Sequence, residues 1–141
     1  MRRRDHNIAF LQALPHMTMG IPADYLEATK ATIAVGEMVG PAYVRFGREA
    51  VPSFTTEETP FKLGRAETFR EGNDVAIIAC GWMVWESLLA AERLAKEGIQ
   101  ARVINVHTIK PIDTETIAKA AGECGAVVTA EEHQIWGGLG S

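Results

Sequence analysis

Two arginines three residues apart are the side chains in this sequence best suited to chemistry. Arg45 and Arg48 lie in Tyr43-Val-Arg-Phe-Gly-Arg48, at the end of an expected strand and in the turn after it. In open α/β sheets, ligands bind beyond the carboxyl ends of the strands, and a guanidinium group matches a phosphate bidentately. The pattern predicts an anion clamp for a phosphorylated substrate. The alternative is two surface arginines, one of them paired with Glu49.

A glycine-rich turn, Trp136-Gly-Gly-Leu-Gly-Ser141, follows another expected strand. Its glycine spacing differs from GxGxxG, so a tight structural turn is favoured over a phosphate cradle at a helix N-terminus. Ser141 is a good N-cap residue for a helix that the 141 residues do not contain. We therefore expect the sequence to be a piece of a longer α/β protein.

The histidines and cysteines give no independent catalytic signal. His133 follows Glu131 and Glu132, but a strand-end loop histidine is favoured over a metal ligand. His107 ends another expected strand, where packing or hydrogen bonding is favoured over catalysis. Cys80 has no identifiable partner base and no GxSxG elbow is present, so core packing is favoured for this thiol.

Composition excludes several classes of protein. The formal charge is 14 − 18 = −4, with 47% hydrophobic and 23% charged residues, which is ordinary globular usage and not that of a basic nucleic-acid binder. The longest uncharged apolar stretch, 75–85, is too short for the roughly 20 residues of a membrane helix. The two cysteines, Cys80 and Cys124, are interpreted as reduced core thiols of a cytoplasmic protein.

The second half of the sequence has the pattern of a parallel α/β sheet. Its apolar runs are continuous rather than alternating, as in strands covered on both faces. We expect helices from Met83 to Glu97 and from a capping Asp113 onward. The expected strands are 75–79, 101–106 and 126–130, with 66–70 as an additional strand. The result is a β-α-β-α-β unit, half of a doubly wound sheet.

The first half is also α/β but contains fewer elements. A helix is expected from Asp24 to about Met38, opened by a capping-box-like pair of Asp24 and Glu27. The other expected elements are a helical fragment at 8–13 and strands at 18–21 and 42–46. Two strands cannot close a core, so this half looks incomplete. The polar, proline-bounded stretch that follows is typical of a linker.

Several motifs resemble those of the transketolase superfamily of thiamine-diphosphate enzymes. Leu14-Pro-His-Met17, Ile21-Pro-Ala-Asp24 and the segment 41–48 resemble the last third of its pyrimidine-binding domain. Residues 71–81, His107-Thr-Ile-Lys-Pro-Ile-Asp113 and 129–141 resemble its C-terminal domain. Within the superfamily, the separate C-terminal subunit of split transketolases is the most similar.

The resemblance implies the tail of a pyrimidine-binding domain at 1–51, a linker at 52–65 and a C-terminal domain at 66–141. The C-terminal domain would be a three-layer α/β/α unit with a mainly parallel sheet, and both domains would be incomplete. The implied reaction transfers a two-carbon ketol unit between sugar phosphates through thiamine diphosphate. Arg48 matches the family arginine that contacts the sugar phosphate, and Arg45 is a second candidate.

The same resemblance implies that other parts of the site lie elsewhere. The family's activating glutamate and its diphosphate and Mg²⁺ ligands match no residue here, so no catalytic, cofactor-binding or metal-binding residue is assigned. Thiamine diphosphate and Mg²⁺ are expected in the complete enzyme and not in this chain alone, which we expect to be inactive. The expected partners are an N-terminal transketolase subunit and a second copy of the chain.

Three other functions stay open. One is another thiamine-diphosphate enzyme, either a deoxyxylulose phosphate synthase or the β subunit of a 2-oxoacid dehydrogenase. The second is an assembly module that makes subunit contacts through Trp82, Trp85 or Trp136. The third is a nucleotide-binding module, which needs a phosphate site at the Gly137 turn.

Overall fold

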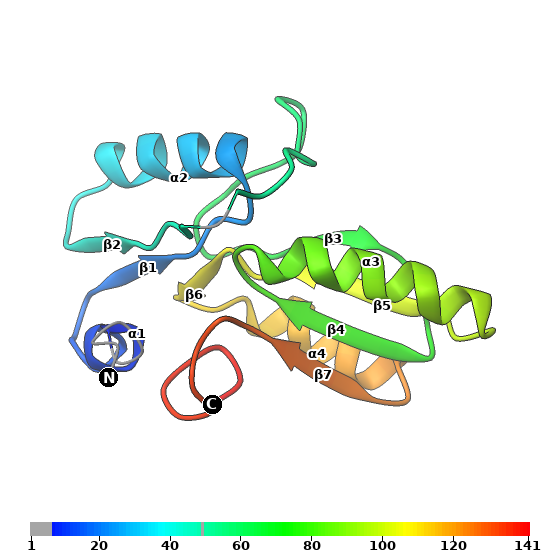
Figure 1. The fold of residues 1–141 in the computed structure, drawn as a ribbon. Coiled ribbons are helices and arrows are strands. Elements are labelled where there is room, and N and C mark those ends of the chain that lie inside the picture. The colour runs from blue at the N-terminus through cyan, green and yellow to red at the C-terminus, as the bar shows by residue number, and fades with distance from the viewer. Residues whose placement is uncertain (1–6, 49) are drawn as a thin grey trace.

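The computed structural model describes residues 7–48 and 50–141, which form four helices and seven strands (Figure 1). Glu49, the expected partner of an arginine in one interpretation, lies outside the described residues. The elements are α1 (Asn7–Gln12), β1 (Thr18–Gly20), α2 (Tyr25–Glu37), β2 (Ala42–Val44), β3 (Glu67–Arg70), β4 (Val75–Ala79), α3 (Met83–Lys96), β5 (Ala101–Asn105), β6 (Thr108–Lys110), α4 (Thr114–Glu123) and β7 (Val127–Ala130).

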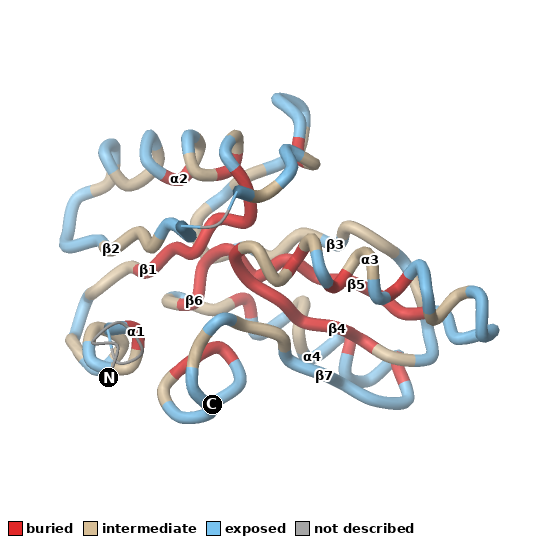
Figure 2. Tube along the Cα trace, viewed as in Figure 1, coloured by how far each residue is buried: buried red, intermediate tan, exposed pale blue. Residues whose placement is uncertain are grey.

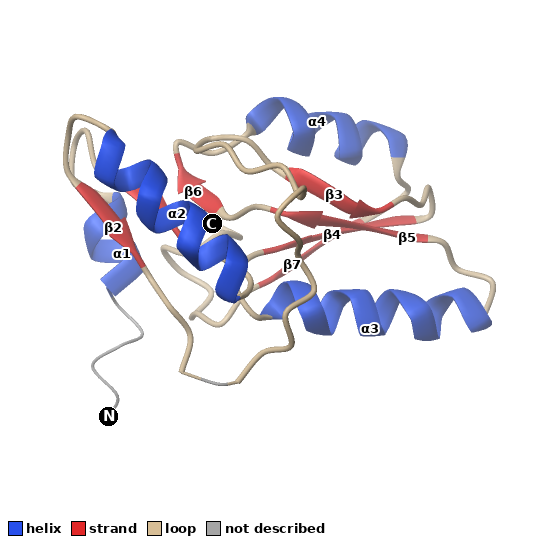
Figure 3. Cartoon of the chain, turned by 90° about the horizontal axis from the view of Figure 1, so that it is seen from above, coloured by secondary structure: helices blue, strands red, loops and turns tan. Residues whose placement is uncertain are grey.

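The larger sheet has the strand order β3-β5-β4-β7 and lies between α3 and α4, giving three layers (Figure 3). β4 pairs in parallel with β5 and β7, whereas β3 is antiparallel to β5. Alternate residues of β4 enter different cores, because Ile77 packs with Ala91 of α3 and Ile78 belongs to a cluster with Ala120 of α4. The predicted α/β class and the mainly parallel, doubly covered sheet are confirmed. Figure 2 shows the buried segment of β4 and β5 at its centre.

The smaller sheet has the order β2-β1-β6, and its third strand comes from the second half of the chain. The first half contributes only its two expected strands, β1 and β2, and the sheet is completed by a strand that the sequence did not predict. β6 has three residues and was missed, because a run this short has no periodicity of its own. It pairs antiparallel with β1, and Lys110 Nζ donates to the carbonyl oxygens of Gln12 and Leu14 at 2.7 and 2.6 Å. The two halves of the chain thus share one sheet.

Asp24 joins the start of α2 to the segment that links the two halves. Its Oδ1 accepts from the backbone N of Glu27 at 3.0 Å and from Thr55 Oγ1 at 2.8 Å. Its Oδ2 accepts from the backbone N of Phe54 and of Thr55 at 2.9 and 2.7 Å. Burial raises the pKa of Asp24, but these four hydrogen bonds outweigh burial and leave the pKa lowered. The predicted helix start is confirmed, and its cap also fixes the linker segment.

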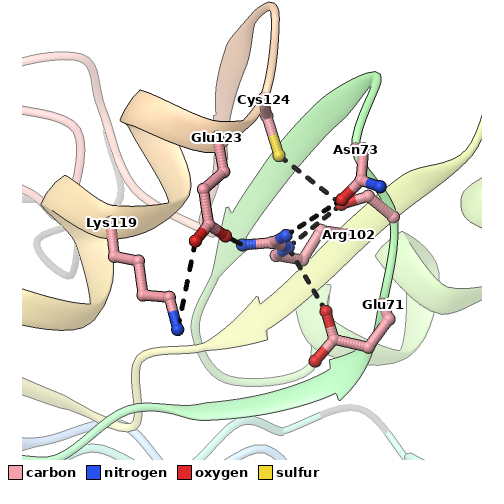
Figure 4. A network of polar contacts seen from close by, with 7 residues as sticks. Glu71, Asn73, Arg102, Lys119, Glu123 and Cys124 are labelled. Atoms are coloured by element: carbon pink, nitrogen blue, oxygen red, sulfur yellow. Dashed lines mark hydrogen bonds and ion pairs between the residues drawn. The ribbon is translucent and has the colours of Figure 1, made fainter.

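A second polar network lies at the amino end of the larger sheet (Figure 4). The side chain of Arg102 donates to Glu123 Oε2 at 2.6 Å and to the carbonyl oxygen of Gly72 at 3.0 Å. Asn73 Oδ1 and Glu71 contact the same guanidinium group. Its acceptors are supplied by a turn and a helix end, so this network connects β5 to its neighbours.

Residues 50–66 contain no helix or strand, as expected for a linker; the domain division at 52–65 stays a prediction. Cys80 and Cys124 are buried and free, as predicted for core thiols. No helix among the described residues is long and apolar enough to cross a membrane.

We expect Asp24→Ala to lower the free energy of unfolding by about 3 kcal/mol, because it removes a helix cap and leaves buried amide donors unpaired. Urea denaturation at pH 7 measures the change. D24N keeps one acceptor oxygen, so its free energy of unfolding should fall by about half as much as that of Asp24→Ala. The control is Thr32→Ala on the exposed face of α2; equal effects of Asp24→Ala and this control would contradict the role assigned to Asp24.

Candidate functional site

Arg45 and Arg48 follow β2, but their surroundings differ. The backbone N of Arg45 donates to the carbonyl oxygen of Gly20 at 2.9 Å, which extends the β1–β2 pairing by one bond. Its Nη1 donates to the carbonyl oxygen of Glu132 at 2.8 Å, and its Nη2 lies 3.7 Å from Glu132 Oε2. Arg48 is exposed and has no hydrogen bond or ion pair with another residue of 7–48 or 50–141. Of these two guanidinium groups, that of Arg48 is therefore the one available to an external anion.

A hollow of about 280 Å³ adjoins the segment that carries Arg48. Phe46, Gly47 and Val51 of that segment form part of its wall, and Trp82 before α3 forms another part. The start of α2 closes it, with the Asp24 carboxylate already bound by protein donors. The wall of the hollow is largely apolar, and Arg48 follows the lining residue Gly47 in the sequence, an arrangement suited to a small phosphorylated molecule.

A second, water-sized hollow of about 20 Å³ lies where the carboxyl ends of the two sheets meet. Arg45, Cys80 and Glu131 line it. Burial, and next the negative charge of Glu131, raise the pKa of the Cys80 thiol to about 12. The thiol is therefore protonated at neutral pH and unsuited to nucleophilic attack, as expected for a core cysteine.

The glycine turn binds a carboxylate of its own chain. Glu131 Oε2 accepts from the backbone N of Leu139 at 2.8 Å, and Oε1 accepts from the backbone N of Gly140 at 3.0 Å. A Cβ added to Gly138 would come within 2.2 Å of Glu131 Oε2, so the carboxylate would have to move away from the two backbone N atoms that it binds. These amides are occupied, which favours the structural turn over a nucleotide phosphate site.

The described residues do not by themselves fit thiamine diphosphate and Mg²⁺. They contain no group of three or more His, Cys, Asp or Glu side chains able to hold a metal ion. The carboxylates that line the two hollows belong to Asp24, Glu131 and Glu132, and each already contacts a donor of this chain. His133 Nδ1 contacts the carbonyl oxygen of Gln134, in agreement with a loop position.

A buried polar connection between α2 and β5 was not predicted. Glu27 is 2% exposed; its Oε2 accepts from the backbone N of Ala23 at 2.6 Å, and its Oε1 accepts from Asn105 Nδ2 at 2.7 Å. Burial raises the pKa of Glu27 to about 7 despite these bonds. The capping pair gave the only sequence signal for Glu27, and a cap is normally exposed.

His107 belongs to the same interior and keeps its predicted packing role. The ring stacks on Phe61 with the centroids 4.2 Å apart, and Nδ1 lies 2.9 Å from Thr108 Oγ1. Nε2 is buried without a hydrogen-bond partner among the described residues. Burial lowers the pKa of His107 to about 4, so the ring is neutral at pH 7.

The fold and the arginine site define an α/β protein with two sheets, which meet at their carboxyl ends. Residues 64–141 match the family model "Transketolase, C-terminal domain". The chain therefore belongs to the transketolase C-terminal domain family.

The similar proteins include transketolase subunits. The chain is 44% identical over 135 residues to the 6-deoxy-6-sulfo-D-fructose transketolase subunit SqwH of Clostridium sp. (strain MSTE9), covering 96% of this chain and 42% of that protein. It is 42% identical over 137 residues to an apulose-4-phosphate transketolase subunit of Phocaeicola vulgatus, covering 96% and 44%. It is also 42% identical to 1-deoxy-D-xylulose-5-phosphate synthase of Heliobacterium modesticaldum, covering 96% of this chain and 21% of the synthase.

A solved structure agrees with these relatives. A split-gene transketolase, described as an inactive β4 tetramer, superposes with a TM-score of 0.87 at 42% identity over 96% of this chain and 45% of that chain. The chain thus spans less than half the length of each of these similar proteins.

The two buried titrating groups predict an unusual pH profile of stability. Glu27 is protonated more readily in the folded chain, so its contribution to stability is lost as pH rises from 4.5 to about 7. His107 is protonated less readily in the folded chain, so its contribution is gained as pH rises from about 4 to 6.5. The two slopes, each at most about 1.4 kcal/mol per pH unit, oppose one another between pH 4.5 and 6.5.

In E27Q only the His107 contribution remains, so we expect the free energy of unfolding to rise with pH between 4.5 and 6.5. In H107F only the Glu27 contribution remains, so we expect it to fall over the same range. Urea denaturation at half-unit pH steps measures both slopes, with Lys119→Ala, on the exposed face of α4, as the control. Parallel profiles for wild type and E27Q would contradict the assignment of a raised pKa to Glu27.

Proposed function

We propose that this chain is part of the C-terminal section of a two-part transketolase, which transfers a two-carbon ketol unit between sugar phosphates. The observation that carries the proposal is the 42–44% identity over 96% of the chain to two transketolase subunits. The free guanidinium of Arg48 beside a hollow at the carboxyl ends of the strands supports a phosphorylated substrate. The donor and acceptor sugars are left open, since these two relatives are named for different sugars.

The chain's own residues would bind and orient rather than react. Arg48 would hold the substrate phosphate through charge-assisted hydrogen bonds, and the apolar wall of Phe46, Val51 and Trp82 would exclude water on one side. When bound in the assembly, thiamine diphosphate supplies the electron sink that carbon–carbon cleavage beside a carbonyl requires. Because the described residues do not fit this cofactor, its site is assigned to the assembly and the chain alone is expected to be inactive.

The proposed assembly contains an N-terminal transketolase subunit and a second copy of the chain. The names of the two subunit relatives and of the split-gene structure support a separate partner polypeptide. We place the reaction in the cytoplasm, consistent with free buried thiols.

A deoxyxylulose phosphate synthase is the second candidate, supported by 42% identity to one such enzyme. That reaction uses pyruvate as donor and releases carbon dioxide, whereas ketol transfer uses a ketose phosphate. The test is an assay of the reconstituted two-subunit assembly with thiamine diphosphate, Mg²⁺ and glyceraldehyde 3-phosphate as acceptor. Release of erythrose 4-phosphate from fructose 6-phosphate, or of the corresponding aldehyde from another ketose phosphate, supports the proposal. Turnover with pyruvate as the sole accepted donor overturns it in favour of the synthase.

We expect Arg48→Gln in this assembly to raise KM for a phosphorylated acceptor between about 10-fold and 150-fold, because a charge-assisted contact is worth about 1.5–3 kcal/mol. KM for unphosphorylated glyceraldehyde should stay the same. Initial rates with both acceptors measure the ratio, and Arg65→Gln, whose partner is Glu115, is the control. An equal rise in KM for both acceptors would contradict a role of Arg48 in phosphate recognition.

A further inference from the structure

Hydrogen bonds fix the chain on both sides of Arg48, at Arg45 and at Phe54 and Thr55. None of the residues 46–48 and 50–53 forms a hydrogen bond with another described residue. At the far end, the backbone N atoms of Phe54 and Thr55 donate to Asp24. At the near end, Arg45 is the last residue bonded to the β1–β2 pair. The position of Arg48, three residues beyond Arg45, therefore depends mainly on the near end.

Arg45 is itself held from the other half of the chain. Its side chain is 19% exposed and crosses from the smaller sheet to Glu132, 87 residues later in the sequence. The bond from Nη1 to the Glu132 carbonyl oxygen is a charge-assisted contact of 2.8 Å. The second contact, from Nη2 to Glu132 Oε2 at 3.7 Å, adds an ion pair to the same residue.

The residue that holds Arg45 is rigidly placed. Glu132 comes two residues after β7, whose last residue, Ala130, pairs with Ala79 of β4. The backbone N of Cys80 donates to the Ala130 carbonyl oxygen at 3.3 Å. Between Ala130 and Glu132, Glu131 is bonded to the glycine turn through two backbone N atoms. The sheet and the turn thus fix the chain around the point that Arg45 reaches.

We propose that the Arg45–Glu132 contact positions the phosphate-binding arginine, so that Glu132 of the C-terminal family domain controls recognition of the substrate phosphate by Arg48. This inference rests on the proposed function, and it assigns Arg45 a positioning role in place of direct phosphate binding. A phosphate at Arg45 would meet the carboxylates of Glu131 and Glu132, which line the same small hollow. Arg48 has no such neighbour among the described residues.

The test uses the two-subunit assembly and compares KM and kcat for glyceraldehyde 3-phosphate and for glyceraldehyde. We expect Arg45→Met to raise KM for the phosphorylated acceptor about 10-fold and Glu132→Gln about threefold, because Glu132→Gln keeps the carbonyl contact. kcat with either acceptor, and KM for glyceraldehyde, should change less than about twofold. A rise in KM without a change in kcat is expected when the lost contact binds substrate and transition state equally. Arg45→Lys, which can still reach Glu132, should recover most of the loss. Glu115→Gln, in an exposed pair with Arg65, is the matched control.

A second readout does not depend on activity. Hydrogen–deuterium exchange of the peptide spanning residues 45–53 should become at least about fivefold faster in Arg45→Met, while exchange in β4 and β5 stays the same. Unchanged exchange in this peptide would overturn the inference even if the assembly is inactive.

The kinetic outcomes separate the two proposals. An active assembly in which Arg48→Gln raises KM but Arg45→Met does not would overturn the inference and leave the proposed function standing. A lower KM in Glu132→Gln would also overturn it, because Arg45 would then bind phosphate once released. No ketol transfer by the wild-type assembly would instead count against the proposed function.

Discussion

The buried carboxylates at the start of α2 set the geometry on which the rest of this chain depends. Asp24 accepts four hydrogen bonds and ties the helix to Phe54 and Thr55. Glu27, one turn later, reaches Asn105 at the end of β5. A helix cap at a surface is worth about 1 kcal/mol. Here the capping residues also connect the two sheets and the linker, and they do so in the interior, where an unpaired donor is costly. The larger hollow is lined partly by the start of α2, so its shape depends on these hydrogen bonds of Asp24.

Charge is distributed differently at the two ends of the larger sheet. At the amino end, Arg102 is surrounded by acceptors from turns and α4, and this guanidinium group is not available to a ligand. At the carboxyl end, Glu131 and Arg45 are also satisfied within the chain. Arg48, by contrast, is exposed and has no ion pair with another described residue, and it follows a strand at the end where parallel sheets bind ligands.

Much of the fold could be predicted because its signals are local in the sequence. Continuous β-branched runs identified β4, β5 and β7, and capping residues placed the starts of α2 and α4 within one residue. β6 was missed because three residues carry no periodicity, and its pairing with β1 is a non-local contact. The buried state of Glu27 could not be deduced from its capping spacing, because burial depends on Asn105, 78 residues away.

The two arginines show the same limit within the site. Residue type and spacing treat Arg45 and Arg48 alike, and both were predicted as phosphate ligands. They differ because Arg45 is bonded to Glu132, which lies 87 residues later in the sequence and is brought close only by the folding of both sheets. A guanidinium already bonded to a carbonyl and a carboxylate must lose both contacts before it can bind phosphate, whereas an exposed one loses only water. The folded chain therefore makes unequal two residues that are equivalent in sequence, and it does so with a contact between its two halves.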